Sequence, residues 1–299
     1  MHAPGEVRKL FVYEEVAEIR HAVAAARREG KRIGVVPTMG ALHAGHLSLI
    51  EAARAECEFV VVTIFVNPTQ FGPQEDLSRY PRPFEADLEE CRQRGVDAVF
   101  HPRTQTVYPP DFKTYVTVEE LSNVWEGAFR PGHFRGVATV VLKLFTMVQP
   151  DVAYFGQKDF QQQLIVKRMC GDLNVPVEIR VCPIVRDADG LALSSRNVYL
   201  SAFERNSALA LSRALFFAEK ELHARDPDVA AIQKMMCQIV SSADGVTLDY
   251  VTIADPDTLN ELTTIQRQMV LLVAARVGRT RLIDNVLVTL PEPRETFAP

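Results

Sequence analysis

Hydrophobic residues follow two alternating patterns in the first two thirds of the chain. Spacing of three or four residues predicts helices, whereas short unbroken apolar runs predict strands. The predicted helices span residues 13–29, 43–57, 84–95, 137–148 and 160–173. The predicted strands span residues 33–36, 59–66, 98–100, 151–155 and 177–181.

The run at residues 59–66 is entirely apolar or β-branched, which is typical of a central parallel strand covered on both faces. Together with the strand at 33–36 and the helix between them, it forms a βαβ unit. We therefore predict an α/β fold with a doubly wound parallel sheet. The ligand site of such a sheet lies at the carboxyl ends of its strands.

The pattern changes beyond residue 200. Two helices, 202–223 and 227–241, precede strands at 247–254, 269–277 and 280–288, the last two joined by a hairpin after Gly278. This order predicts a second, smaller α+β domain, so we divide the chain into residues 1–185 and 186–299. Residues 101–118, with three prolines, are predicted to be irregular, and the polar tail 291–299 to be disordered.

Composition narrows the classes of function. The 299 residues carry a net charge of -5, which gives no overall electrostatic footprint for nucleic acid. No apolar run approaches the roughly 18 residues that span a bilayer, so no membrane partner is expected. Five scattered cysteines without a CxxC pair, and a start that does not resemble a signal peptide, lead us to expect a reduced, cytoplasmic protein.

The strongest candidate site follows the first predicted βα turn. His43 and His46 lie three residues apart at a predicted helix start, where backbone N–H groups and the helix dipole favour anions. Gly40 and Gly45 let backbone approach a ligand closely. The alternative is a pair of surface histidines.

Two further polar groups follow predicted strands. Asn67 and Gln70 leave the 59–66 strand and are expected near the two histidines, although Asn67 is equally compatible with a plain turn. Lys158 follows the 151–155 strand and is expected to face the same crevice. Asp159 is either a helix cap or a ligand for a ribose or a metal.

The last two clusters are cationic. Ser194, Ser195 and Arg196 supply two hydroxyls and a guanidinium fork suited to phosphate. Residues 126–136 place two arginines and a histidine among three glycines before an apolar helix. Such a loop suits polyphosphate binding or a mobile lid, but it is also compatible with an ordinary solvated loop.

The motifs that are missing favour chemistry on a nucleoside triphosphate over hydride transfer or hydrolysis. No nucleophile elbow is recognisable, the first βα turn lacks G-x-G-x-x-G, and the chain has no G-x-x-x-x-G-K-[ST]. The nucleotide would therefore bind without a P-loop.

Taken in order, these stretches resemble the pantothenate synthetase (pantoate–β-alanine ligase) family, including its form of the nucleotidyltransferase His-x-Gly-His motif. The resemblance spans nearly the whole chain. Its stretches are residues 37–46, 65–71, 130–137, 155–162, 191–197 and 280–285. The chain departs from the family at Gln157, where Glu is frequent, and at Trp125, where Leu is usual.

The resemblance implies a Rossmann-like N-terminal domain, a C-terminal domain that closes over the site, and a homodimer. It also implies that ATP, accompanied by Mg²⁺, activates (R)-pantoate as a pantoyl-adenylate, which β-alanine converts into pantothenate with release of AMP; pyrophosphate leaves in the first step. The protein ligands of Mg²⁺ stay unassigned.

The family's site residues carry over to matching positions. Gln70 and Gln162 correspond to pantoate contacts, and His46 to the assigned proton donor. The groups expected to stabilise charge during catalysis are His43, His46, Lys158 and Arg196. The positions that correspond to ATP contacts are Met39, Gly40, Ala41, Leu42, His43, Ala44, Gly45, His46, Gly156, Gln157, Lys158, Asp159, Val185, Leu193, Ser194, Ser195 and Arg196.

Two other functions are compatible with the motifs. A cytidylyl- or adenylyltransferase shares the His-x-Gly-His chemistry but keeps the nucleotide on its product. A nucleotide-binding sensor would bind ATP without turnover. Free AMP as an end product distinguishes a ligase from both.

Overall fold

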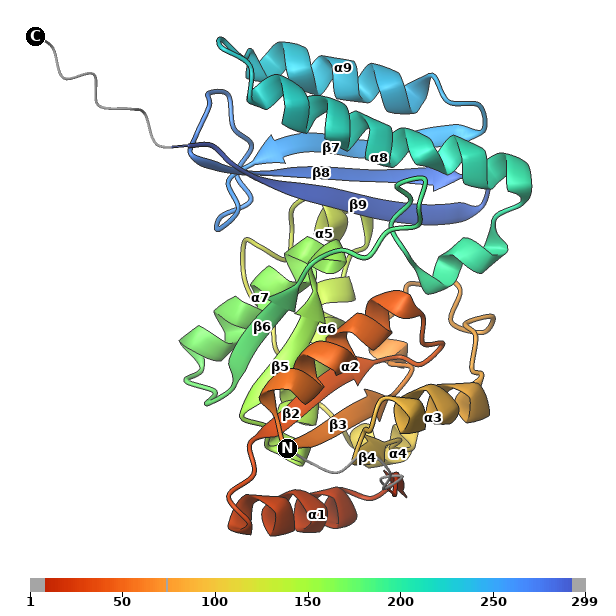
Figure 1. Cartoon of the computed structure of the whole chain (residues 1–299), viewed down its shortest axis with the longest axis vertical. Helices are drawn as coiled ribbons and strands as arrows, with labels where there is room; N and C mark the ends of the chain where they lie inside the picture. Colours follow the sequence, from red (N-terminus) through yellow and green to blue (C-terminus); the bar gives the residue numbers. More distant parts are fainter. Residues whose placement is uncertain (1–8, 74, 292–299) are drawn as a thin grey trace, which may run out of the picture. The chain divides into compact units, whose positions relative to one another are not determined.

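The computed structural model describes residues 9–73 and 75–291, which fall into two compact units (Figure 1). The first unit contains the chain up to Val185 together with Leu193–Ser195. The second contains Arg186–Ala192 and the chain from Arg196 onward. The predictions for the extreme N-terminus and for residues 292–299 of the tail lie outside the described residues.

The first unit contains a six-stranded parallel sheet, as predicted. Its spatial order is β1-β4-β3-β2-β5-β6. The strands are β1 (Phe11–Tyr13), β2 (Ile33–Thr38), β3 (Phe59–Ile64), β4 (Ala98–Phe100), β5 (Val152–Gly156) and β6 (Glu178–Cys182). From β2 the chain runs outward through β3 and β4, with β1 at the edge beyond β4, and from β5 it runs outward to β6. The switch point therefore lies between β2 and β5, where ligands bind in doubly wound sheets.

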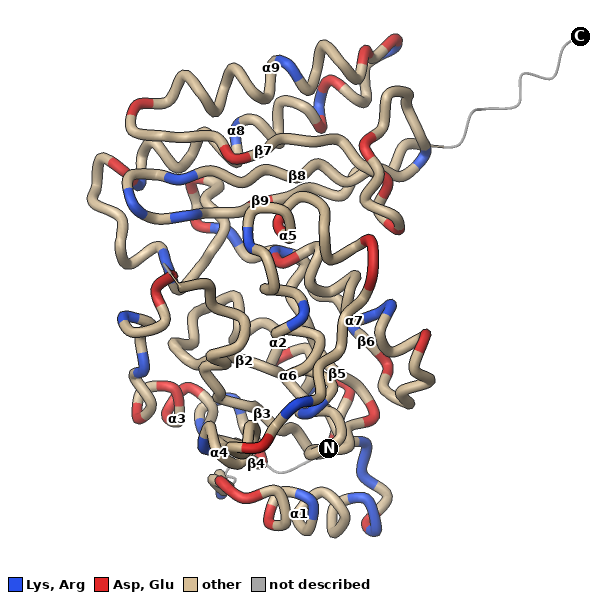
Figure 2. Tube along the Cα trace, turned by 180° about the vertical axis from the view of Figure 1, so that it is seen from behind, with Lys and Arg blue, Asp and Glu red and all other residues tan. Residues whose placement is uncertain are grey.

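Helices cover both faces of this sheet. They are α1 (Val16–Arg28), α2 (Ala44–Glu56), α3 (Phe84–Gln93), α6 (His133–Val148) and α7 (Phe160–Asp172). Ile50 of α2 and Leu88 of α3 share one core cluster with Val36, Val62 and Tyr154 of the strands. Helix α6 contacts α1 and α7 over the other face. Figure 2 shows charge gathered on helices such as α1 and α3, whereas β2 and β3 carry none.

Three local features differ from the sequence-based predictions. Strand β1, which the pattern did not predict, is a three-residue edge strand too short to show a period. A one-turn helix, α4 (Thr104–Val107), interrupts the segment predicted to be irregular. The segment predicted as a glycine-rich loop is largely helical: a three-residue turn, 130–132, separates α5 (Glu126–Phe129) from the first turn of α6. The glycines of this segment lie at helix ends and at close backbone contacts, but in the sequence they gave the segment the composition of a loop.

The second unit is the predicted smaller α+β fold. A three-stranded antiparallel sheet is formed by β7 (Val246–Ala254), β8 (Gln268–Val277) and β9 (Thr280–Thr289). Helices α8 (Ala202–Leu222) and α9 (Val229–Ser241) pack on it around one apolar core. The predicted hairpin joins β8 to β9 through Gly278, whose φ of 56° lies in the left-handed region. Among the helices of the described residues, none has the length and apolar character needed to cross a bilayer.

Arg186 joins the start of the second unit to β9. Its guanidinium makes two parallel bonds to the buried Asp284 carboxylate, at 2.6 and 2.8 Å, and a third to the Asn285 carbonyl. Such a bidentate pair is stronger than a single ionic contact and fixes the orientation of both groups.

We predict that Asp284→Ala destabilises the protein by about 3–5 kcal/mol, because it leaves a largely buried guanidinium without its carboxylate. Urea unfolding followed by circular dichroism measures the change. The matched control is Asp172→Ala, which removes an exposed i,i+4 partner of Arg168 and should cost less than about 1 kcal/mol. Equal effects of the two substitutions would contradict the prediction.

Candidate active site

The turn that follows β2 adopts a backbone conformation unusual for residues other than glycine. Gly40 and Ala41 have φ values of 80° and 51°. The Thr38 hydroxyl donates to the Thr63 carbonyl of β3 and accepts from the Gly40 N–H. A Cβ on Gly40 would approach the Asp87 carboxylate to 2.9 Å. Glycine is thus required here by both conformation and space.

Asp87 of α3 fixes this turn by hydrogen bonds to its backbone. Its carboxylate is 2% exposed and accepts the backbone N–H groups of Ala41 and Leu42 at 2.9 and 2.8 Å. Burial raises the pKa of Asp87, although the two backbone hydrogen bonds act in the opposite direction. Sequence reasoning missed this residue. The available signal was its position on the inward face of the helix, beside Leu88 and Cys91.

His43 and His46 lie together at the start of α2, as predicted from their spacing. Their ring centroids are 4.1 Å apart. His43 is the N-cap, and its Nδ1 accepts the Gly45 N–H, so the proton of the neutral ring is on Nε2. The Nδ1 atom of His46 is shielded from solvent and has no hydrogen-bond partner among the described residues.

Both imidazoles are held in the neutral form. Burial, with added repulsion from His43 and Lys158, lowers the pKa of His46 to about 3. Burial and the Lys158 charge lower the pKa of His43 to about 4, against the opposing charge of Asp159. At neutral pH each ring therefore offers one N–H donor without a positive charge.

Lys158 comes to this site from the other side of the switch point. It lies in the single-turn 3₁₀ helix η2 (Gln157–Asp159), which directly follows β5. Its charge acts on both imidazoles, and that of Asp159 acts on His43, so these groups are neighbours. Asp159 occupies the N-cap position of α7 without a side-chain capping bond. The predicted meeting of the β2 and β5 loops is therefore present, and Gly156 and Gln157 belong to the same turn.

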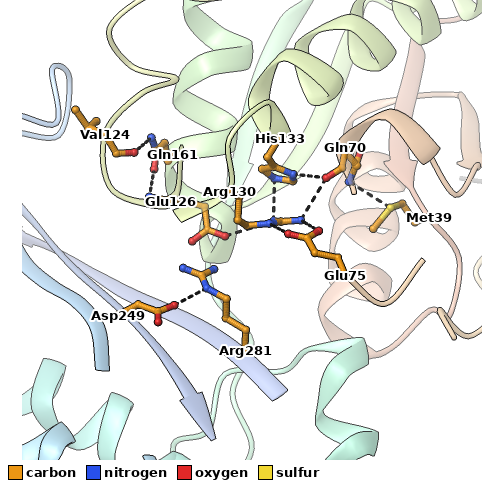
Figure 3. Close-up of polar contacts among 10 residues, drawn as sticks. All are labelled: Met39, Gln70, Glu75, Val124, Glu126, Arg130, His133, Gln161, Asp249 and Arg281. Atoms are coloured by element: carbon orange, nitrogen blue, oxygen red, sulfur yellow. Dashed lines mark hydrogen bonds and ion pairs between the residues drawn. The ribbon is translucent and has the colours of Figure 1, made fainter. Parts of the chain in front are cut away.

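Gln70 belongs to the turn after β3, the 3₁₀ helix η1 (Pro68–Gln70). It is 9% exposed, and its amide nitrogen lies 3.3 Å from the Met39 sulfur (Figure 3). Asn67 caps η1 and donates to the Gln70 amide oxygen, so it both forms the turn and orients its neighbour. Gln162 is half-buried on α7, whereas the adjacent Gln161 is buried and bonds backbone carbonyls of the 121–124 segment.

Of the two arginines in the glycine-rich segment 126–136, Arg130 is held by carboxylates and Arg135 is exposed. Arg130 is bound by the carboxylates of Glu75 and Glu126, and Arg135 stacks on the Tyr115 ring. Gly136 lies so close to η1 that a Cβ would come within 2.4 Å of the Thr69 carbonyl oxygen. The segment is thus a packed support for η1, which does not favour a polyphosphate loop or a mobile lid.

The remaining predicted ATP contacts lie where the chain passes between the units. Val185, Leu193, Ser194 and Ser195 belong to the first unit, and the Ser195 hydroxyl contacts the Tyr80 hydroxyl at 3.3 Å. Arg196 belongs to the second unit. Its meeting with His46 and Lys158 stays a prediction.

Comparison with known proteins identifies the family. A model of the family described as pantoate–β-alanine ligase matches residues 11–287. The chain belongs to the pantoate–β-alanine ligase family. The enzyme is a ligase of pantoate and β-alanine, and the resemblance inferred from the sequence motifs is confirmed.

Relatives match over almost their whole length. The chain is 54% identical over 275 residues to pantothenate synthetase of Moorella thermoacetica, covering 92% of this chain and 97% of that one. The crystal structure of pantothenate synthetase from Thermus thermophilus is 46% identical, with a TM-score of 0.88 and coverage of 92% and 98%. A ligase from Francisella tularensis, complexed with beta-gamma ATP and β-alanine, is 32% identical, with a TM-score of 0.76 and coverage of 93% and 98%.

We predict that Asp87→Ala loosens the turn at residues 40–42, because two backbone N–H groups lose their acceptor. Each buried group left unsatisfied costs about 1–3 kcal/mol. Hydrogen exchange of the Ala41 and Leu42 amides should accelerate, and the protein should unfold at lower temperature. Glu85→Ala, on the exposed face of the same helix, is the control, and equal exchange rates in the two variants would contradict the prediction.

We also predict that neither His43 nor His46 becomes protonated between pH 5 and 8 in the folded protein. A histidine pKa below its usual 6.5 stabilises the fold fully above about pH 6.5, and this contribution is lost as pH falls toward 4 and 3. Ring proton shifts in NMR, assigned with His43→Gln and His46→Gln, measure both midpoints. The urea-unfolded chain, in which both rings should titrate near 6.5, is the reference; a folded midpoint above pH 5 would contradict the prediction.

Proposed function

We propose that the enzyme joins pantoate to β-alanine through a pantoyl-adenylate, with ATP as the activating substrate. The observation that carries this proposal is the meeting of His43, His46 and Lys158 at the switch point of the parallel sheet. The complex of the Francisella relative with beta-gamma ATP and β-alanine supports the same choice of substrates.

The first step is attack of the pantoate carboxylate on the α-phosphorus of ATP. An oxygen–phosphorus bond forms, pyrophosphate leaves, and negative charge grows on the phosphoryl oxygens and the leaving group. The N–H donors of His43 and His46 and the ammonium group of Lys158 stabilise that charge where it develops. We propose that Arg196 of the second unit joins them.

Neutral imidazoles suit this step. Two imidazolium groups beside Lys158 would repel one another, whereas neutral rings donate hydrogen bonds at no such cost. The proposed role of His46 as proton donor then consists of hydrogen bonding to the phosphate.

Gln70 and Gln162 are the proposed pantoate contacts. Both are neutral amides on the elements that follow β3 and β5. Amides hold hydroxyl and carboxylate groups without an ion pair that would weaken the attacking carboxylate. The remaining proposed ATP contacts are Met39 through Gly45, Gly156, Gln157, Asp159, Val185 and Leu193 through Ser195, on the loops described above.

The second step needs protection of the mixed anhydride from water. The β-alanine nitrogen attacks the pantoyl carbonyl carbon, and the bond from that carbon to the phosphate oxygen breaks to release AMP. We propose that the second unit provides the closure, because segment 126–136 is packed against η1. A homodimer, as the resemblance implies, is part of this proposal.

Mg²⁺ is proposed to arrive with ATP. Within the described residues no group of three or more His, Cys, Asp or Glu side chains could hold a metal ion. Mg²⁺ characteristically binds substrate phosphates with few protein ligands, so the nucleotide itself is its proposed main ligand. The bound ion would neutralise part of the triphosphate charge.

An isotope experiment tests the adenylate. Pantoate labelled with ¹⁸O in its carboxylate should transfer one labelled oxygen to AMP when ATP and β-alanine are supplied, measured by mass spectrometry. Lys158→Met should slow adenylate formation by a few hundredfold, whereas Lys167→Met, on the exposed face of α7, should not. Unlabelled AMP would contradict the adenylate, and nucleotide retained on the product would indicate a nucleotidyltransferase.

A further inference from the structure

Arg130 is the centre of a buried polar network beside η1 (Figure 3). Its side chain is 13% exposed and makes two bonds of 2.7 Å to the two carboxylate oxygens of Glu75. A third contact, at 3.3 Å, reaches the buried Glu126. Burial raises the pKa of Glu75, but its bonds to Arg130 outweigh that effect and keep the pKa below its usual range. Two carboxylates thus surround one guanidinium.

The next member of the network is His133 at the start of α6. Its Nδ1 lies 2.8 Å from the Gln70 carbonyl oxygen, which only accepts, so Nδ1 carries the proton. Its Nε2 lies 3.1 Å from Arg130, which only donates, so Nε2 is the acceptor. Both bonds are satisfied by one neutral tautomer. Burial and the Arg130 charge agree with it, because they lower the pKa of His133 to about 4.

The network ends on the backbone carbonyl of Gln70. That oxygen accepts from His133 and, at 3.4 Å, from Arg130. The Gln70 side chain is fixed separately, since its amide oxygen accepts from Asn67 and its amide nitrogen points to Met39. Gly136 closes the arrangement by bringing α6 against the Thr69 carbonyl.

We infer that Arg130, oriented by Glu75, and His133 are positioning residues that set the place of Gln70 for pantoate. This inference rests on the proposed function, in which the Gln70 amide contacts pantoate. Arg130 and His133 hydrogen-bond the main-chain carbonyl of Gln70. By fixing the main chain there, they also set the place from which the Gln70 side chain extends. A shift of a substrate-positioning group by about 1 Å is enough to cost a hundredfold in rate.

The charges argue against the alternative that Arg130 itself binds a substrate anion. Its planar fork is already occupied by one carboxylate, and the second carboxylate of Glu126 leaves the cluster without net positive charge. An incoming anion would have to displace Glu75 from two short bonds. Lysine at position 130 would keep the charge but lose the fork geometry that bonds Glu75, His133 and Gln70 at once.

The test is a double-mutant cycle in the full-length enzyme with ATP, pantoate and β-alanine. Arg130→Lys and Glu75→Gln should each raise KM for pantoate about tenfold or more, with KM for ATP and for β-alanine unchanged. In a Gln70→Ala background, Arg130→Lys should add no further increase, because coupled residues are not additive. Glu89→Gln, which removes an exposed partner of Arg92 on α3, is the matched control and should leave all three constants unchanged.

The outcomes separate the inference from the proposed function. If Gln70→Ala leaves KM for pantoate unchanged, the assignment of Gln70 fails, and the inference with it. If Gln70→Ala raises that KM but Arg130→Lys raises it equally in both backgrounds, only the inference fails. A rise in KM for ATP or β-alanine in Arg130→Lys would indicate direct anion binding and also overturn it. If the Arg130→Lys variant does not fold, Glu75→Gln, which keeps the shape of the side chain, takes its place in the double-mutant cycle with Gln70→Ala. The result of that cycle then decides the inference.

Discussion

The parallel pairing of β2 with β5 is the constraint on which the site depends. These two strands lie side by side although more than a hundred residues separate them, with Gly34 opposite Val152 and Val35 opposite Ala153. Because parallel strands end at the same edge, the turn that carries His43 and the turn that carries Lys158 emerge together. Among strands β2 to β6, this is the adjacent pair at which the winding reverses. The apolar core under both strands keeps this edge in register, so the chemistry depends on ordinary packing.

Electrostatics at this edge are set by burial and by neighbouring charges acting together. Lys158 supplies the permanent cation, and its presence helps to keep the two imidazoles uncharged. Around Arg130, the carboxylates of Glu75 and Glu126 compensate the cation. The charge of Arg130 is therefore neutralised inside a support, whereas the charge of Lys158 acts on the two imidazoles. The difference lies in what surrounds each residue, since arginine and lysine in a glycine-containing stretch look alike in sequence.

The sequence was most informative where periodicity and local spacing determine structure. The long helices, the central strands and the pairing of His43 with His46 follow from patterns within a few residues. Contacts between distant segments were not accessible in this way. Asp87 holds a turn more than forty positions away, and Arg130 finds Glu75 across a similar separation. The glycine-rich segment that ends at Gly136 was interpreted as a loop. In the structure, the small size of Gly136 instead permits two backbones to touch. Burial and close approach are properties of the folded chain, so composition alone does not predict them.

The contact at Gly136 also bears on how the turn of Gln70, proposed to bind pantoate, could be diversified. A side chain usually transmits a shift in part, because rotamers adjust and absorb it. Here a helix meets a carbonyl with only a hydrogen atom between them, so movement of α6 passes to η1 undamped. If Gln70 contacts pantoate as proposed, engineering that seeks a different carboxylic acid substrate should vary the residues around Gln70 and hold position 136 invariant, because this position works as a fixed spacer.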